Sequence, residues 1–200
     1  LSCTPAPPGA TVVDFLLECI GYPPAQDLEA LATLVRARGI GGDRSVIDAF
    51  EAIRNAIVQR ERDGAKLLAE VVEMREKMRD NLDKSSDDTF DVKQGRGGIT
   101  DIEFMVQYLL LRFSSEHPQL CHYSDNIRQL EALENACLLD VHVAERLAGI
   151  YRVLRAAHHR YALQEKPAII PSDELAEERR IVSEAWEKLM QPDASASRSA

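Results

Sequence analysis

Residues 90–113 read FDVKQGRGGITDIEFMVQYLLLRF, and this stretch decides the fold that the sequence predicts. Its second part, from Ile102 to Phe113, is apolar at most positions and leaves little polar surface. A helix that is apolar on nearly all sides is usually buried at the centre of a domain. We therefore expect a buried central helix here, with a glycine-rich turn before it.

That turn holds glycine at three of four consecutive positions, Gly95, Gly97 and Gly98. Glycine permits positive φ and close backbone approach, and such a turn before a helix directs free N–H groups outward. Lys93 and Arg96 would add positive charge. One hypothesis is therefore a phosphate or partner site formed by Lys93, Gly97 and Gly98.

A purely structural turn is the alternative. Thr100 followed by Glu103 fits the capping box T-x-x-E before an apolar run, in which both side chains cap the helix start. Asp101 in the first turn favours the helix dipole. Asp101 and Glu103 are two positions apart and point to different sides of a helix, so we do not expect them to share a metal ion.

Helical spacing continues on both sides of this stretch. No proline occurs from Ala25 to His117, which permits long helices. Apolar residues recur every three or four positions, which is a helix period. The predicted fold class is all-α, a bundle of six to seven helices with the Gly-rich turn before the buried central helix. The predicted helices cover 46–57 (capped by Asp43), 67–82 (set off by Gly64), 126–138, 143–161 (capped by Asp140) and a last one from Ser172, as its cap, to Met190.

The chain divides into three regions by composition. Residues 1–27 form an atypical Pro-rich segment, since five of the nine prolines fall within the first 24 residues. Residues 28–190 form the helical domain. Residues 191–200 form a Ser/Ala-rich tail that we expect to be disordered.

Charge and hydropathy exclude several classes of function. Lys plus Arg is 24 and Asp plus Glu is 33, a net charge of −9, which argues against a general nucleic-acid binder because phosphate contacts need a basic face. No apolar run is long enough to span a membrane. The four cysteines form no C-x-x-C pair, and we expect reduced thiols in a cytoplasmic protein.

Residues 90–113 closely resemble the adenylyltransferase half of the bifunctional glutamine synthetase adenylyltransferase/adenylyl-removing enzymes. The resemblance runs in one register from about residue 28 to residue 190. The flanks that carry it are LVRARGIGGD (34–43), EVVEMREKMRDNL (70–82), YSDNIRQLEAL (123–133) and HHRYALQEKP (158–167).

The resemblance implies a role in nitrogen control. Enzymes of this family transfer AMP from ATP to a tyrosine of glutamine synthetase, and their other half removes it by phosphorolysis. The family implies ATP and Mg²⁺ for the full-length enzyme. It implies glutamine synthetase, the PII signal protein and the remainder of the adenylyltransferase as partners. The chain resembles the helical domain that follows the C-terminal nucleotidyltransferase core.

The departure from the family is a missing motif. Such a core carries a Gly-Ser or Gly-Gly turn and then an Asp-x-Asp pair that holds Mg²⁺, and the chain has no such motif. Residues 1 to about 27 do not match the family. We therefore assign no catalytic residue and no metal ligand, and we expect the chain alone to be inactive.

Basic residues supply the remaining candidates. Arg36 and Arg38 lie in the RAR sequence that follows the core in the family, so they are candidates for phosphate or interface contact, with a solvated helix end as the alternative. The segment around Arg75 and Arg79 reads as an amphipathic helix with its Met residues inward and its charges in solvent. These two arginines could also contact the core domain or the substrate enzyme. His158–His159 lacks metal-ligand spacing.

Two other functions stay open. The chain could be a non-enzymatic interaction module that binds glutamine synthetase or PII. It could instead be the helical domain of a PII uridylyltransferase, a paralogous enzyme with a related helical domain.

Overall fold

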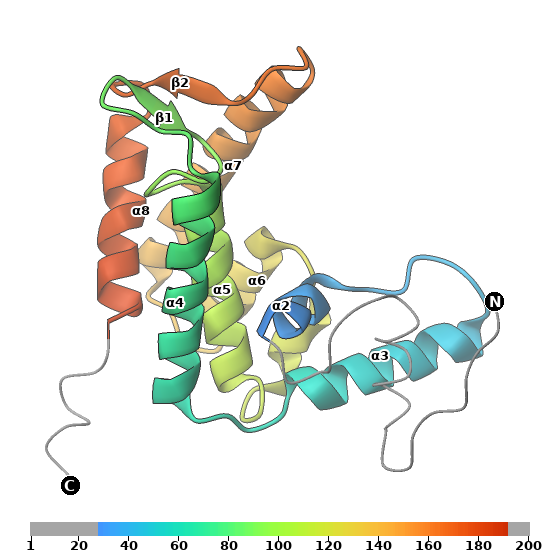
Figure 1. The fold of residues 1–200 in the computed structure, drawn as a ribbon. Coiled ribbons are helices and arrows are strands. Elements are labelled where there is room, and N and C mark those ends of the chain that lie inside the picture. Colours follow the sequence, from blue (N-terminus) through green and yellow to red (C-terminus); the bar gives the residue numbers. More distant parts are fainter. Residues whose placement is uncertain (1–27, 192–200) are drawn as a thin grey trace, which may run out of the picture.

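A computed structural model describes residues 28–191. Within this range the chain forms seven α-helices, one short 3-10 helix and one two-stranded sheet, which confirms the predicted all-α bundle (Figure 1). The predicted Pro-rich segment 1–27 and all but the first residue of the predicted disordered tail lie outside the described residues. The elements are α2 (Leu28–Arg36), α3 (Arg44–Val58), α4 (Gly64–Leu82), β1 (Thr89–Asp91), α5 (Ile99–Phe113), η1 (Pro118–His122), α6 (Asn126–Asn135), α7 (Val141–Ala162), β2 (Ile169–Pro171) and α8 (Ala176–Leu189).

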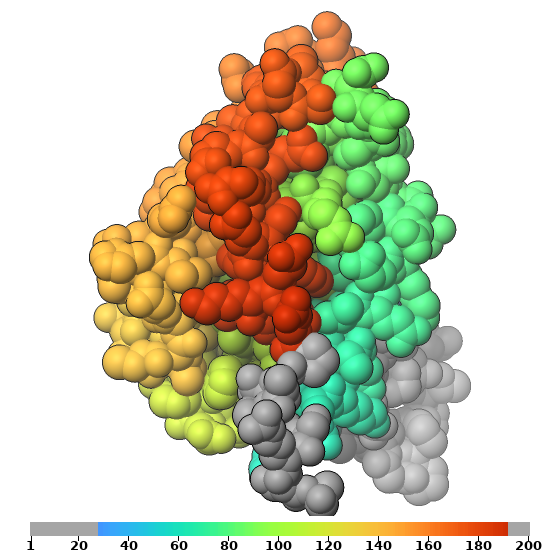
Figure 2. All heavy atoms as spheres, turned by 90° about the vertical axis from the view of Figure 1, so that its left-hand side faces the viewer, coloured from blue at the N-terminus to red at the C-terminus, as the bar shows by residue number. Residues whose placement is uncertain are grey.

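Helix α5 is the centre of the bundle, as its apolar sequence predicts. It packs against α2, α4, α6, α7 and α8. Ile102, Val106 and Leu110 have no exposed surface. Figure 2 shows α8 in red, flanked in that view by α7 in orange and by α4 in green. No helix within residues 28–191 combines the length and the apolar composition that crossing a bilayer requires.

Aspartate caps begin four of the helices. Asp43 and Asp140 accept backbone N–H bonds at the starts of α3 and α7, as predicted. Asp63 and Asp125 do the same for α4 and α6, which follows from the preference for short polar acceptors at this position. The predicted cap at Ser172 is wrong: α8 begins after Leu175, whose φ of 57° is left-handed.

Two helices differ from their predicted form. α6 ends at Asn135, three residues before the predicted Leu138, because Cys137 is left-handed with φ 58° and the Leu138 N–H turns back to Leu133 O. α3 is helical as predicted, yet only its last turns reach the core. Val46, at its start, is 66% exposed.

Helical spacing predicted neither the short 3-10 helix nor the two-stranded sheet. β1 and β2 pair antiparallel, with Phe90 opposite Ile170. Both of these residues are buried. The pairing draws the chain before α5 together with the chain after α7, so the glycine-rich turn lies beside the start of α8 (Figure 1).

Candidate functional site

The glycine-rich turn is closed by its own hydrogen bonds. The Gly97 N–H donates to Asp101 Oδ2 at 2.7 Å, and the Gly98 N–H donates to Gly95 O at 2.9 Å. The Ile99 and Thr100 N–H groups donate to Val92 O and Lys93 O. The expectation that this turn directs free N–H groups outward is therefore wrong for its glycines, since their donors already have acceptors.

Close packing explains why glycine is needed there. Gly97 has φ +80°, and a Cβ on it would lie 2.4 Å from the carbonyl oxygen of Arg179 in α8. A Cβ on Gly98 would lie 2.8 Å from the carbonyl oxygens of Gly95 and Val92. Both glycines thus permit close contact between backbones. This packing role supports the alternative that the turn is purely structural.

The predicted capping box does not form. α5 begins after Gly98, which makes no side-chain cap, and Thr100 is already the second residue of the helix. The Thr100 Oγ1 atom is buried without a partner among the described residues. Glu103 points away from the helix start and bonds to Arg36 and Tyr151 instead.

A buried charge cluster lies beneath the turn. Asp101 Oδ1 accepts from Arg75 Nε at 2.7 Å and from Arg79 Nη2 at 3.0 Å. Arg75 also donates to Gln94 O. Arg75 is fully buried and Arg79 is 8% exposed. The prediction that these arginines are solvated, or free to contact a partner, is wrong because the face of α4 that carries both of them turns toward Asp101 of α5.

A second polar network reaches the surface and joins four helices. Arg36 Nη1 of α2 lies 3.2 Å from Glu103 Oε2 of α5. Tyr151 of α7 donates to Glu103 Oε1, and Asn126 of α6 donates to the Tyr151 hydroxyl, each at 2.9 Å. Burial raises the pKa of Tyr151, and the nearby charge of Glu103 raises it further. Of these four residues, the sequence singled out Arg36 as a site residue and Glu103 only as a cap.

Beside this network is a hollow of about 440 Å³ between α2, α6 and α7. We call it the arginine hollow. Three arginines line it, Arg36, Arg152 and Arg155, against one carboxylate, that of Asp125. The remaining lining residues are Ser124, Asn126, Ile127 and Tyr151.

Arg38 lies in a neighbouring polar hollow of about 520 Å³, which also contains Arg54 and Arg128. The guanidinium of Arg54 is buried and donates to the Leu34 and Val35 carbonyls at the end of α2. It thereby holds the backbone from which the side chains of Arg36 and Arg38 extend. The two predicted arginines occupy different hollows, as their spacing of two residues indicated.

Lys93 acts electrostatically on His158 of α7. Burial lowers the pKa of His158, and the positive charges of Lys93 and Arg155 lower it further, while Asp91 opposes them. These charges therefore lie close to the imidazole of His158. Arg155 also lines the arginine hollow with Arg36. Lys93 itself does not line the arginine hollow.

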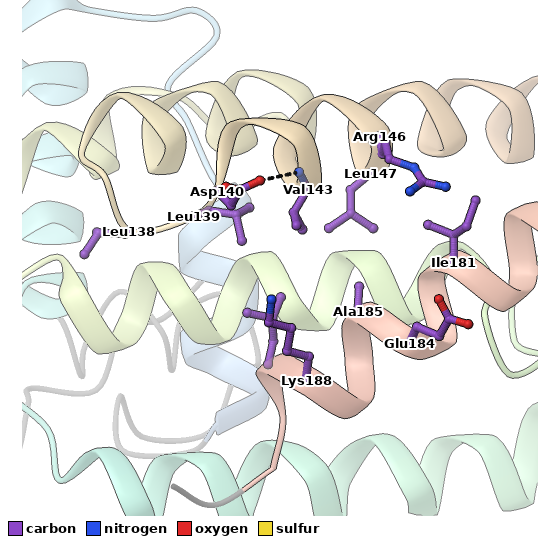
Figure 3. Close-up of a pocket in the computed structure, with 11 residues that line it drawn as sticks. Leu138, Leu139, Asp140, Val143, Arg146, Leu147, Ile181, Glu184, Ala185 and Lys188 are labelled. Atoms are coloured by element: carbon purple, nitrogen blue, oxygen red, sulfur yellow. Dashed lines mark hydrogen bonds between the residues drawn. The ribbon is translucent and has the colours of Figure 1, made fainter.

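A third hollow, of about 280 Å³, lies between α7 and α8 (Figure 3). Leu147, Ile181 and Ala185 give it an apolar lining, and Arg146, Glu184 and Lys188 carry charges around it. No predicted site residue lies there.

The described part of the chain also contains side chains of the types that ligate metal ions. Mg²⁺ takes carboxylate and other oxygen ligands. Between residues 28 and 191, no group of three or more His, Cys, Asp or Glu side chains lies close enough together to hold a metal ion. Asp101, the most buried carboxylate near the turn, is already bound by two arginines.

Comparison with known proteins gives a consistent family. A family model described as GlnD PII-uridylyltransferase matches residues 65–186. The bifunctional glutamine synthetase adenylyltransferase/adenylyl-removing enzyme of Hahella chejuensis is 50% identical over 161 residues, 78% of this chain. The enzyme of the same name from Nitrosococcus oceani is 46% identical over 162 residues, 81% of this chain.

The chain spans 17% of the length of each of these two relatives. The part matched by the family model, residues 65–186, includes the buried charge cluster, the glycine-rich turn and, of the polar network, Glu103, Asn126 and Tyr151. The chain belongs to the family described as GlnD PII-uridylyltransferase, and its resemblance to the glutamine synthetase adenylyltransferase/adenylyl-removing enzymes is confirmed.

Proposed function

We propose that this chain is the helical domain of an enzyme that transfers AMP from ATP to glutamine synthetase and removes it again. In this proposal the chain supports a nucleotidyltransferase core and lacks the metal site of that core. The observation that carries it is the arginine hollow, which we also call the arginine face. Its residues Arg36, Arg152 and Arg155 bring three positive charges together in a chain whose net charge is negative. Phosphate chemistry requires such charge beside the nucleotide.

The polar network supports a positioning role for this face. Arg36 is held by Glu103, which is itself held by Tyr151, so the network ties α2 to the central helix. Arg54 fixes the end of α2 from the other side. A preorganised charge stabilises a developing negative charge without reorganising at the moment of reaction. These contacts support the proposal that Arg36 and Arg38 face the nucleotide or the core, and we propose the same orientation for Lys93.

ATP and Mg²⁺ belong to the whole enzyme in this proposal. The carboxylates that hold Mg²⁺ would lie in the core, since the described part of this chain has no cluster for a metal. Glutamine synthetase is the protein substrate, and PII and the remainder of the enzyme are the proposed regulatory and structural partners.

A docking module without catalysis is the second candidate, and one surface favours it. Ile40 is 88% exposed and Val46 is 66% exposed, both near the start of α3. Contiguous exposed apolar patches mark contact surfaces, and in this alternative these two side chains would contribute to one. A uridylyltransferase of PII is a further alternative because the matching family model carries that description, although the two relatives quoted above are adenylyltransferases.

A chimera separates these functions. Residues 28–190 would replace the matching segment of the Hahella chejuensis enzyme, and radiolabelled AMP incorporation into glutamine synthetase would be measured with ATP and Mg²⁺. We expect an active chimera, no transfer by the isolated chain and no UMP transfer from UTP to PII. A folded chimera without activity, or AMP transfer by the isolated chain, would contradict the proposal.

Two variants of the chimera test the arginine face. Arg36→Ala removes a charge from this face and should lower kcat/KM. Arg180→Ala is the matched control, because Arg180 lies exposed on α8 and, among residues 28–191, forms ion pairs with Glu177 and Glu184 of its own helix. An equal loss of kcat/KM in both variants would contradict a specific role for the arginine face.

A further inference from the structure

Helix α4 carries an apolar stripe that its packing against the bundle uses only in part. The main helical neighbour of α4 is α5, and α4 turns Arg75 and Arg79 toward it. Met74 and Met78 lie on another side of α4 and are half-buried, and Leu82 is 47% exposed. The prediction that the methionines point inward is therefore only partly correct, because the two arginines occupy the more buried positions.

The stripe lines a groove of about 580 Å³, which we call the methionine groove. Its apolar lining comes from two helices, since Leu28 of α2 joins Met74, Met78 and Leu82 of α4. The remaining lining residues are Glu70, Glu73, Lys77 and Asn81.

The charges of the methionine groove already have partners. Lys77 lies 2.7 Å from Glu73, and Lys66 lies 3.9 Å from Glu70. These pairs follow one another along the same helix, and each is satisfied without a ligand. The groove therefore favours an apolar occupant over an ion.

The place of Leu28 indicates which part of the polypeptide reaches the groove first. Residues 1–27 join the described structure at Leu28, so the chain before α2 starts from the edge of the groove. Residues 192–200 join it after α8, which does not line the groove. They also contain no Val, Leu, Ile, Met or aromatic residue.

The sequence before Leu28 contains one apolar run, residues 12–20. Asp14 and Glu18 are the charged residues of this run, and their spacing of four puts them on one side of a helix. The other side of such a helix would present a stripe with the i, i+3, i+4, i+7 spacing, formed by Val13, Leu16, Leu17 and Ile20. An amphipathic helix that lays its apolar side into a groove is a recurring mode of recognition.

The connection between this run and α2 is long enough. The eight steps from Ile20 to Leu28 span at most about 26–29 Å when the chain is extended. The groove follows α4 from Glu70 to Leu82, a distance of about 18 Å along a helix. Residues 12–20 can therefore reach every part of the groove within one molecule.

We propose that residues 12–20 bind in the methionine groove and cover the stripe of Met74, Met78 and Leu82. The contact is intramolecular, so a short connection supplies an effective concentration of about millimolar and a small apolar area suffices. This contact goes beyond the proposed function, because it involves neither a nucleotide nor a protein substrate.

The four methionines of the chain provide the test. Met74 and Met78 line the groove, whereas Met105 and Met190 are buried in the core. NMR of the full 200-residue chain with ¹³C-methyl methionine would compare the parent with Leu17→Asp. A carboxylate in an apolar contact is costly, so the variant should release the segment. We expect shifted signals for Met74 and Met78 and unchanged signals for Met105 and Met190.

Ala10→Asp is the matched control, because it adds the same charge just before the apolar run. It should leave all four methionine signals in place. Peroxide oxidation followed by mass spectrometry gives a second measurement, since methionine sulfoxide forms faster at exposed sulfur atoms. Leu17→Asp should increase the oxidation rates of Met74 and Met78, and Ala10→Asp should not.

Four outcomes would overturn the proposal. The first two are unchanged Met74 and Met78 signals in Leu17→Asp, and equal shifts in Leu17→Asp and Ala10→Asp. The third is a shift of all four signals in Leu17→Asp, since the contact would then not be confined to the groove. The fourth is a change of the parent Met74 and Met78 signals on dilution, which would show that a second copy of the chain covers the groove.

Discussion

The carboxylate of Asp101 lies 2.7 Å from Nε of Arg75, and both side chains are almost completely buried. This pair links α4 to the first turn of α5. The second oxygen of Asp101 accepts the N–H of Gly97, so one carboxylate holds both the helix packing and the shape of the turn.

Arg75→Ala should therefore destabilise the chain strongly. Removing one partner of a buried pair leaves a buried charge with less compensation, and the typical cost is about 3–5 kcal/mol. We expect the lower end of this range, because Arg79 and Gly97 still bind Asp101. Urea denaturation measures the free energy of unfolding.

Lys77→Ala is the matched control for that experiment. Lys77 lies on the same helix and pairs with Glu73 at 2.7 Å, but both side chains are largely exposed. An exposed pair contributes about 0–1 kcal/mol. If Arg75→Ala were no more destabilising than Lys77→Ala, the buried pair would not stabilise the fold.

Gly97→Ala should also destabilise the chain, by about 2 kcal/mol or more. A non-glycine residue at φ +80° is strained, and its Cβ would collide with the backbone of Arg179. We expect α8 to pack less tightly, with a lower melting temperature by circular dichroism.

Gly149→Ala should stabilise the chain, in contrast to Gly97→Ala. Gly149 lies within α7, and an added Cβ would meet no atom within 4 Å. Alanine in a helix interior is favoured over glycine by about 0.5–1 kcal/mol, so this variant should be more stable than the parent chain. A destabilised Gly149→Ala variant would contradict the described surroundings of this helix.

Glu103→Ala should destabilise the polar network. It leaves the partly buried Tyr151 hydroxyl without its acceptor, at a cost of about 1–2 kcal/mol. Glu103→Gln keeps an acceptor oxygen and removes only the charge, so it should cost less. It should also lower the pKa of Tyr151 relative to the parent chain, since burial remains and the negative charge of Glu103 is lost. NMR titration with labelled tyrosine measures this change.

His158 should titrate below the ordinary histidine value of 6.5. The pKa is lowered first by burial and then by Lys93 and Arg155, so Lys93→Ala or Arg155→Ala should raise it. NMR titration of the imidazole checks this order. A pKa that is unchanged in both variants would show that these charges do not face His158.

The same shift has a defined effect on stability. Because the folded pKa of His158 lies below the unfolded value, the unfolded chain binds this proton more readily. The contribution of His158 to stability is therefore lost as the pH falls from 6.5 through the folded pKa. The His158→Asn variant should lose less stability than the parent chain over this range.

Local patterns predicted most of the helices, because the spacing of apolar residues and the capping residue are both visible in a short stretch of sequence. The apolar run of Ile102 to Phe113 indicated the central helix, and Asp43 and Asp140 indicated helix starts. The resemblance carried by residues 90–113 indicated the family. Helical spacing put Val46 on the apolar face of its helix and Arg75 on the charged face of another. It did not show that Val46 is exposed and that Arg75 is buried.

The sequence by itself determined the all-α class, the buried central helix and the family, because periodicity, capping and motif spacing are properties of neighbouring residues. Tertiary structure alone decided that Arg75 is buried against Asp101, that Asp101 closes the glycine turn, and that Arg36 meets Glu103 across 67 positions. The physical reason is that charged residues recur along a helix with the same spacing whether that face lies in solvent or packs against a buried carboxylate. Only the packing of α2, α4 and α7 around α5 determines which environment each charge meets.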